Sequence, residues 1–102
     1  MGKYIDVNTI KPMQIEFDPT KNASNERKHG VSLGLAAELE WDTLRSRTDT
    51  RRDYGEARQI GYVIAGQRLY CVVFVDRAGG LRRIISLRKA NSREVASYVR
   101  KA

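Results

Sequence analysis

The sequence is poor in the residues that build disulfides, metal sites and membrane segments. Its 102 residues include one cysteine, one histidine, one tryptophan and two prolines. A single cysteine excludes an internal disulfide, and Cys71 lies in an apolar run where a thiol usually packs as a small hydrophobic group. The longest nearly apolar run, residues 69–75, is too short to cross a bilayer. One histidine and one cysteine fit no zinc-ligand spacing, so we expect no metal and no cofactor. The short apolar run and the single cysteine also lead us to expect no membrane partner and a reducing, cytoplasmic setting.

Positive charge is concentrated in the last fifth of the chain. Of a net charge of +7, residues 82–102 supply seven Lys or Arg against one Glu, while residues 1–81 nearly balance. Such a local field attracts polyanions, of which phosphate backbones are the commonest. The alternative is a solvated basic surface. In residues 81–89, however, the arginines alternate with Ile and Leu, which favours side chains presented from a folded sheet.

Local signals divide the chain into short elements. Asp18 and Pro19 mark a helix start, and Asn91 with Glu94 has the spacing of a capping box. Residues 42–55 have no periodicity and are predicted to form a loop. The expected elements, in chain order, are a strand over 14–17, helices over 19–29 and 33–41, strands over 56–65, 68–76 and 81–89, and a helix from 92.

This order of elements, β-α-α-β-β-β-α, predicts an α+β fold. A small antiparallel sheet, made of a three-stranded meander joined by the first strand, is expected to have helices packed on it. The length fits one domain with a single core. We predict an irregular leader over residues 1–13 and a single domain over residues 14–102.

Four segments, over residues 17–25, 28–32, 55–61 and 83–98, resemble the BrnT family of bacterial toxins. They contain Phe-Asp-Pro-Thr-Lys, Lys-His-Gly-Val-Ser, Gly-Glu-Ala-Arg and Arg-Ile-Ile-Ser-Leu-Arg-Lys-Ala in the family's order. Phe17 stands where the family commonly has Trp. The resemblance implies a RelE-like toxin domain and a ribonuclease that inhibits translation when free.

The same resemblance implies partners. RNA would be the substrate, and a BrnA-type antitoxin with a ribbon-helix-helix DNA-binding segment would neutralise the toxin. One antitoxin dimer holding two toxins would make a heterotetramer, and promoter DNA would be reached only through the antitoxin.

RNA cleavage without a metal needs a base for the 2′-hydroxyl, cations for the phosphate and an acid for the leaving oxygen. Histidine is the side-chain type that changes charge near neutral pH, which makes His29 a catalytic candidate; the alternative is a helix-terminal histidine interacting with the helix dipole. Tyr98 is a candidate proton donor or stacking platform, and the alternative is a core tyrosine with a solvated hydroxyl.

Arginine suits a phosphate that gains charge, because its guanidinium donates paired hydrogen bonds. Arg88 is the first choice, since it stands at a strand end where the sheet opens toward the next helix. Arg58 is the second choice, with pairing to Glu56 as the alternative. The candidate RNA-binding residues are Lys28, Arg82, Arg83 and Lys89.

Strict alternation along residues 81–89 would place Arg83 and Arg88 on opposite faces of the sheet. Either a bulge interrupts this strand, or one of the two arginines is structural or binds the partner. A non-catalytic nucleic-acid-binding module that uses the same basic patch is the alternative function. An interaction protein with an acidic partner is a third reading.

Overall fold

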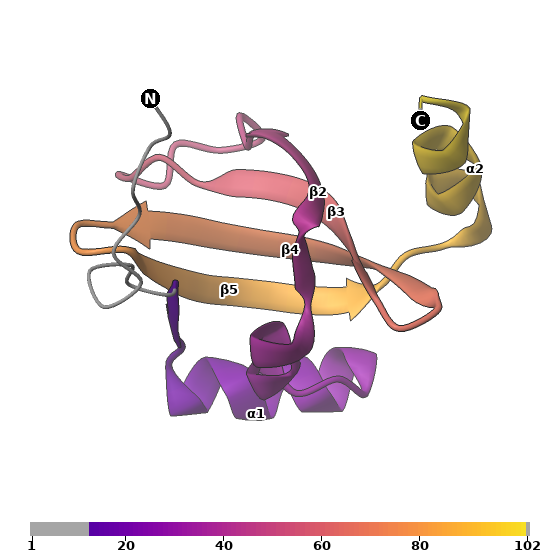
Figure 1. Ribbon diagram of the computed structural model, residues 1–102. Helices are drawn as coiled ribbons and strands as arrows, with labels where there is room; N and C mark the ends of the chain where they lie inside the picture. Colours follow the sequence, from indigo (N-terminus) through magenta and orange to yellow (C-terminus); the bar gives the residue numbers. More distant parts are fainter. Residues whose placement is uncertain (1–12, 102) are drawn as a thin grey trace, which may run out of the picture.

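A five-stranded mixed sheet organises the chain (Figure 1). The structure is a computed structural model and describes residues 13–101. Its sheet order is β1-β5-β4-β3-β2, in which β1 runs parallel to β5 and all other neighbours are antiparallel. The elements are β1 (Gln14–Glu16), α1 (Pro19–His29), the 3-10 helix η2 (Leu33–Glu38), β2 (Glu40–Thr48), β3 (Gln59–Ala65), β4 (Arg68–Arg77), β5 (Leu81–Lys89) and α2 (Ser92–Arg100).

The elements with local start and stop signals agree with the sequence prediction. Asp18 caps α1 by accepting the N–H of Thr20, and Gly30 ends this helix with a φ of 68°. The meander β3-β4-β5 and the capping box of α2 are also confirmed. Apart from Met13, the predicted leader lies outside the described residues.

Four predictions about the sheet and its connections are wrong. Residues 42–48 belong to β2 rather than to a loop, because a sheet edge tolerates a polar strand once Trp41 and Leu44 pack on the core. The second helix is a single short 3-10 segment, since the chain enters β2 at Glu40. The sheet is not purely antiparallel, because β1 pairs in parallel with β5, and β3 begins at Gln59 rather than at residue 56.

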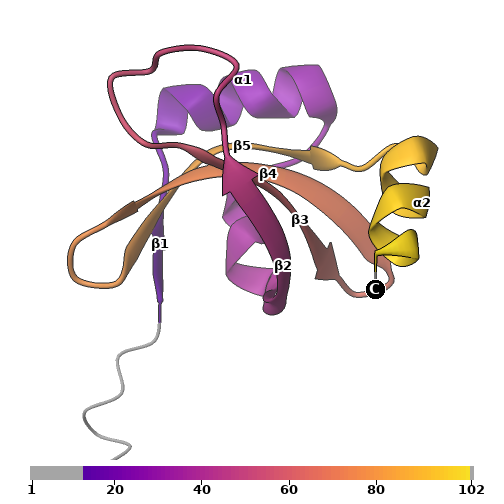
Figure 2. The same cartoon turned by 90° about the horizontal axis from the view of Figure 1, so that it is seen from above.

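The main core lies between the sheet and the layer formed by α1 and η2. Its fully buried members come from η2 and from the three central strands: Leu33, Val63, Val72, Phe74, Ile84 and Leu87. A smaller cluster of Ile60, Cys71 and Val73 covers the opposite face. Helix α1 runs beside β5, and α2 stands apart from α1 beyond the end of β5 (Figures 1 and 2). No helix within residues 13–101 is long and apolar enough to span a membrane.

A β-bulge interrupts the last strand. Val73 pairs with Ser86, whereas Phe74 pairs with Ile84, so that Ile85 is an extra residue on β5. A bulge of this kind shifts the alternation of side chains by one residue. The side chains of β5 therefore change faces at Ile85.

Asn25 completes the outer edge of β5. The described part of β1 pairs only with residues 81–83, so it does not reach Leu87. There the buried Asn25 side chain accepts the Leu87 N–H at 3.2 Å and donates to the Leu87 carbonyl at 2.7 Å. It also donates to the Val31 carbonyl at 2.8 Å. One side chain thus satisfies both backbone groups of a strand residue and ties α1 to the sheet.

Candidate active site

The bulge places Arg83 and Arg88 on one face of the sheet. Arg83 pairs with Val75 and Arg88 with Cys71, and these two partners lie on the same side of β4. Arg82 and Lys89 face the opposite, α1 side. The sequence left two explanations open for Arg83 and Arg88: a bulge in the strand, or a structural or partner-binding role for one of them. The structure contains the bulge.

Arg88 is held by the first turn of α2. Its guanidinium makes two hydrogen bonds with the Glu94 carboxylate, Nη1 to Oε1 and Nη2 to Oε2, each 2.8 Å long. Glu94 also accepts the Tyr62 hydroxyl at 2.8 Å and the Asn91 N–H at 2.9 Å. The end of β5, the start of α2 and the middle of β3 therefore meet at one carboxylate.

The charges in this cluster are fixed around neutral pH. The pKa of Glu94 is lowered to about 2, chiefly because Arg88 donates to its carboxylate, and Glu94 raises the pKa of Arg88 in return. Burial raises the pKa of Tyr62 to about 12 and also raises that of the Cys71 thiol. Arg88 therefore carries a positive charge with 35% of its side chain exposed, while Cys71 is buried and protonated, unlike a nucleophilic thiolate.

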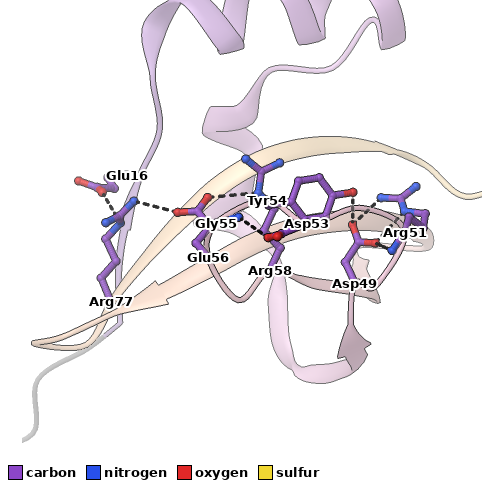
Figure 3. Close-up of polar contacts among 9 residues, drawn as sticks. All are labelled: Glu16, Asp49, Arg51, Asp53, Tyr54, Gly55, Glu56, Arg58 and Arg77. Carbon is purple, nitrogen blue, oxygen red and sulfur yellow. Dashed lines mark hydrogen bonds and ion pairs between the residues drawn. The ribbon is translucent and has the colours of Figure 1, made fainter.

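A chain of ion pairs occupies another part of the protein (Figure 3). Glu56 lies between Arg58, at 3.2 Å, and Arg77, at 3.6 Å, and Arg77 also approaches Glu16 at 3.8 Å. Arg83 donates to Glu16 at 3.0 Å. Arg58 thus pairs with Glu56, which is the alternative that the sequence analysis gave for this residue. Together these contacts join β1, β4, β5 and the loop before β3.

The loop between β2 and β3 is built around a buried carboxylate. Asp49 accepts two hydrogen bonds from the Arg51 guanidinium, at 2.8 and 2.7 Å, and one from the Tyr54 hydroxyl at 3.1 Å (Figure 3). The hydrogen bond from Arg51 holds the pKa of Asp49 well below its usual range. The Arg58 guanidinium stacks on the Tyr54 ring at 4.3 Å. Two of the arginines in this region are therefore engaged within the protein.

The other predicted residues lie elsewhere. Arg82 makes two hydrogen bonds with Asp76, at 2.6 and 2.9 Å, and its guanidinium lies 4.1 Å from the centre of the Phe74 ring. Lys28 and His29 are exposed in the last turn of α1, on the sheet face opposite Arg88. Lys89 is exposed on that same side. The side chains of these four residues thus lie on the face of the sheet opposite that of Arg88.

Tyr98 fastens α2 to β2. Its hydroxyl donates to the Thr43 carbonyl, and the Arg45 guanidinium lies 4.2 Å above its ring. Arg45 also donates to the Tyr98 carbonyl at 2.8 Å. The hydroxyl proton of Tyr98 is therefore held by a backbone oxygen of a neighbouring strand.

Glu94 and Tyr62 are the members of this site that the sequence reasoning missed. The spacing of Glu94 from Asn91 was explained in full by helix capping, and the structure contains that capping box. The same carboxylate has a second role, because it also binds Arg88. The only available signal was that an arginine at a strand end and a glutamate in the first turn of the next helix are six residues apart. Within residues 13–101, no group of three or more His, Cys, Asp or Glu side chains could hold a metal ion.

Comparison with known proteins connects this arrangement to a family. A family model described as the ribonuclease toxin BrnT of type II toxin–antitoxin systems matches residues 17–94. The chain belongs to the BrnT family. The crystal structure of the Brucella abortus ribonuclease toxin BrnT has a similar fold, with a TM-score of 0.60 and 24% sequence identity over 78% of this chain and 99% of that chain. No curated protein matches the chain.

Family membership confirms the resemblance seen in the four sequence segments. The chain is thereby a ribonuclease toxin of a type II toxin–antitoxin system, a class that acts on RNA and is paired with an antitoxin. The match ends at Glu94, so it includes Arg88 and its carboxylate partner.

Proposed function

We propose that this BrnT-family chain is a metal-independent endoribonuclease, with a single RelE-like toxin domain over residues 14–102, that inhibits translation by cleaving cytoplasmic RNA. The observation that carries the proposal is the position of Arg88. Its guanidinium is partly exposed and is oriented by two hydrogen bonds to Glu94. Since a guanidinium has five N–H donors, Arg88 retains donors for a phosphate oxygen.

The proposed reaction is attack of a ribose 2′-oxygen on the adjacent phosphorus. The new O2′–P bond forms as the P–O5′ bond breaks, which leaves a cyclic phosphate on one product and a 5′-hydroxyl on the other. Arg88 is the proposed catalytic residue, because negative charge grows on the phosphate oxygens in the transition state. Arg58 and Tyr98 remain the candidates for the second cation and for proton transfer, whereas the third sequence candidate, His29, lies on the face of the sheet opposite Arg88.

The test is incubation of the purified chain with labelled RNA in EDTA, followed by analysis of the product ends. We expect cyclic or 3′-phosphate ends, and we expect Arg88→Ala to cut more than tenfold slower. A charge-assisted hydrogen bond contributes about 1.5–3 kcal/mol, which corresponds to at least that factor. Arg88→Lys keeps the charge and loses the paired donors, and Arg27→Ala, an exposed change on α1, is the matched control.

Two results would contradict this mechanism. Cleavage that requires added Mg²⁺ or Mn²⁺ would exclude the metal-free route. Full activity in a folded Arg88→Ala would place the active centre elsewhere. Tight RNA binding without any cleavage would instead favour the non-catalytic nucleic-acid-binding module.

We also propose the partner. A BrnA-type antitoxin with a ribbon-helix-helix segment would neutralise the chain in a heterotetramer and would carry the complex to promoter DNA. A short adjacent reading frame should encode it, and its co-expression should restore growth of cells that express the toxin. An isolated gene that can be expressed freely without slowing growth would contradict this proposal.

A further inference from the structure

Ion pairs within residues 13–101 neutralise part of the basic patch that the sequence predicts over residues 82–102. The arginines of β5 are paired with acids from other elements: Arg82 with Asp76, Arg83 with Glu16 and Arg88 with Glu94. By contrast, the cations of α2 form no ion pair with an acid within residues 13–101. The α2 cations and the residue that follows the helix are Arg93, Arg100 and Lys101.

These three cations line a groove of about 550 Å³ between α2 and β2. Arg45 and Arg47 of β2 line the same groove, and Glu94 is its one acidic residue. Five cations against one carboxylate give the groove a strongly positive potential. Two of these five cations come from β2, in a region that the sequence predicts to be a loop.

The two sides of the groove are fixed to each other. Arg45 lies over the Tyr98 ring and donates to the Tyr98 carbonyl, while the Tyr98 hydroxyl donates to β2. The groove is also continuous with the proposed active centre, because Glu94 and Tyr62 belong to both. Arg88 does not itself line the groove, but it is hydrogen-bonded to Glu94, which does.

We propose that the α2–β2 groove binds the phosphate backbone of single-stranded RNA and leads it to Arg88; this rests on the proposed ribonuclease function. Grooves that bind single strands combine cations along the backbone with aromatic rings, and Tyr62 and Tyr98 supply rings in this groove. A flexible single strand can follow a groove whose walls are a helix and a strand, whereas recognition of a duplex relies on a surface that fits its shape.

The experiment compares two triple variants of the full chain that lose equal charge. Arg47→Gln, Arg93→Gln and Arg100→Gln remove cations from the groove. The control removes three exposed cations elsewhere, by Lys21→Gln, Arg27→Gln and Arg52→Gln. The probe is a fully 2′-O-methylated single-stranded oligonucleotide, which lacks the attacking hydroxyl, so affinity is measured over a series of salt concentrations without cleavage.

We expect the groove variant to lose more than tenfold in affinity, with a salt slope that is lower by about 2, since each lost phosphate contact on a single strand changes that slope by about 0.7. The control should keep the wild-type slope. Equal losses in both variants, or no loss in the groove variant, would overturn the proposal. Circular dichroism establishes that both variants are folded.

Two further outcomes separate this inference from its alternatives. A groove variant that binds RNA normally but no longer binds the antitoxin would show a protein-binding surface and overturn the RNA assignment. Wild-type chain that binds the oligonucleotide through the groove but never cleaves unmodified RNA would refute the proposed function and leave the groove assignment standing. Normal cleavage by the groove variant would refute the groove assignment and leave the proposed function standing.

Discussion

Arg88 and Glu94, six residues apart, join the end of β5 to the start of α2 by two hydrogen bonds of 2.8 Å each. The same carboxylate closes the capping box of α2 with Asn91. Because Glu94 both caps the helix and orients the arginine, the position of α2 and the position of the proposed catalytic group depend on each other. A change at Glu94 should therefore affect stability and cleavage together.

The Arg88–Glu94 pair predicts sensitivity to acid. Since the folded-state pKa of Glu94 lies at about 2, below its ordinary 4.5, its contribution to stability is present above about pH 4.5 and is lost as pH falls toward 2. We expect Glu94→Gln to remove about 2–3 kcal/mol of this pH-dependent stability. Urea unfolding at pH 3 and pH 7 measures the effect; identical pH dependence in the variant and the wild type would contradict it.

Arg82 is expected to stabilise the fold rather than to bind RNA. Its guanidinium is already occupied by Asp76 and lies over the Phe74 and Trp41 rings, with 15% of the side chain exposed. Arg82→Gln should lower the melting temperature and leave the salt slope of RNA binding unchanged. A slope lower by about 0.7, the value of one phosphate contact on a single strand, would instead assign Arg82 to the RNA interface.

Asn25 is expected to be a stability residue of β5. Asn25→Ala removes the partners of the Leu87 N–H and carbonyl and of the Val31 carbonyl, all in a buried place. Since an unsatisfied buried backbone group costs about 1–3 kcal/mol, the variant should lose at least that much free energy of unfolding. Glu26→Ala, on the exposed side of the same helix, is the control and should lose far less in a denaturant titration.

Local signals made part of this fold predictable. The ends of α1 are set by Asp18 and Gly30, within a few residues of the helix itself, and the hairpins of the meander are short. Strand β2 was not predicted because it is an edge strand with mostly polar and exposed side chains, so that it shows no hydrophobic alternation. The position of the bulge, at Ile85, was not predicted either, because only the pairing of β5 with β4 shows which residue is extra.

The charge of the site was the least predictable property. Counting along the sequence made residues 82–102 a basic patch, but Glu16, 67 residues away from Arg83, neutralises one of its arginines. Conversely, Arg45 and Arg47 add charge from a region that appeared balanced, because Arg51 is engaged by the buried Asp49. Net local charge depends on tertiary contacts between distant residues, and these are invisible to a count along the chain.

His29 provides a test of where the active centre lies. It is exposed at the end of α1, on the face of the sheet opposite Arg88, so one phosphate cannot contact both side chains. We expect His29→Gln to leave the cleavage rate within about twofold and to change stability by no more than about 1 kcal/mol, the size of a helix-dipole interaction. A tenfold slower cleavage by folded protein would move the active centre to the α1 side, near Lys28 and Lys89.

Gly61 tests whether the placement of β2 matters for RNA binding. A Cβ at this position would lie 2.7 Å from the Arg45 carbonyl oxygen and 2.8 Å from the Ser46 Cβ, so that β2 would have to move away from β3. Gly61→Ala should destabilise the protein by about 1–3 kcal/mol, the usual cost of forcing extra atoms into a packed site. Since β2 carries Arg45 and Arg47, the affinity for the single-stranded oligonucleotide should fall as well.

Gly34→Ala is the control, because its Cβ would meet chiefly the Ser32 side-chain oxygen, at 3.2 Å. Weaker unfolding stability with wild-type RNA affinity would mean that RNA binding does not depend on the position of β2.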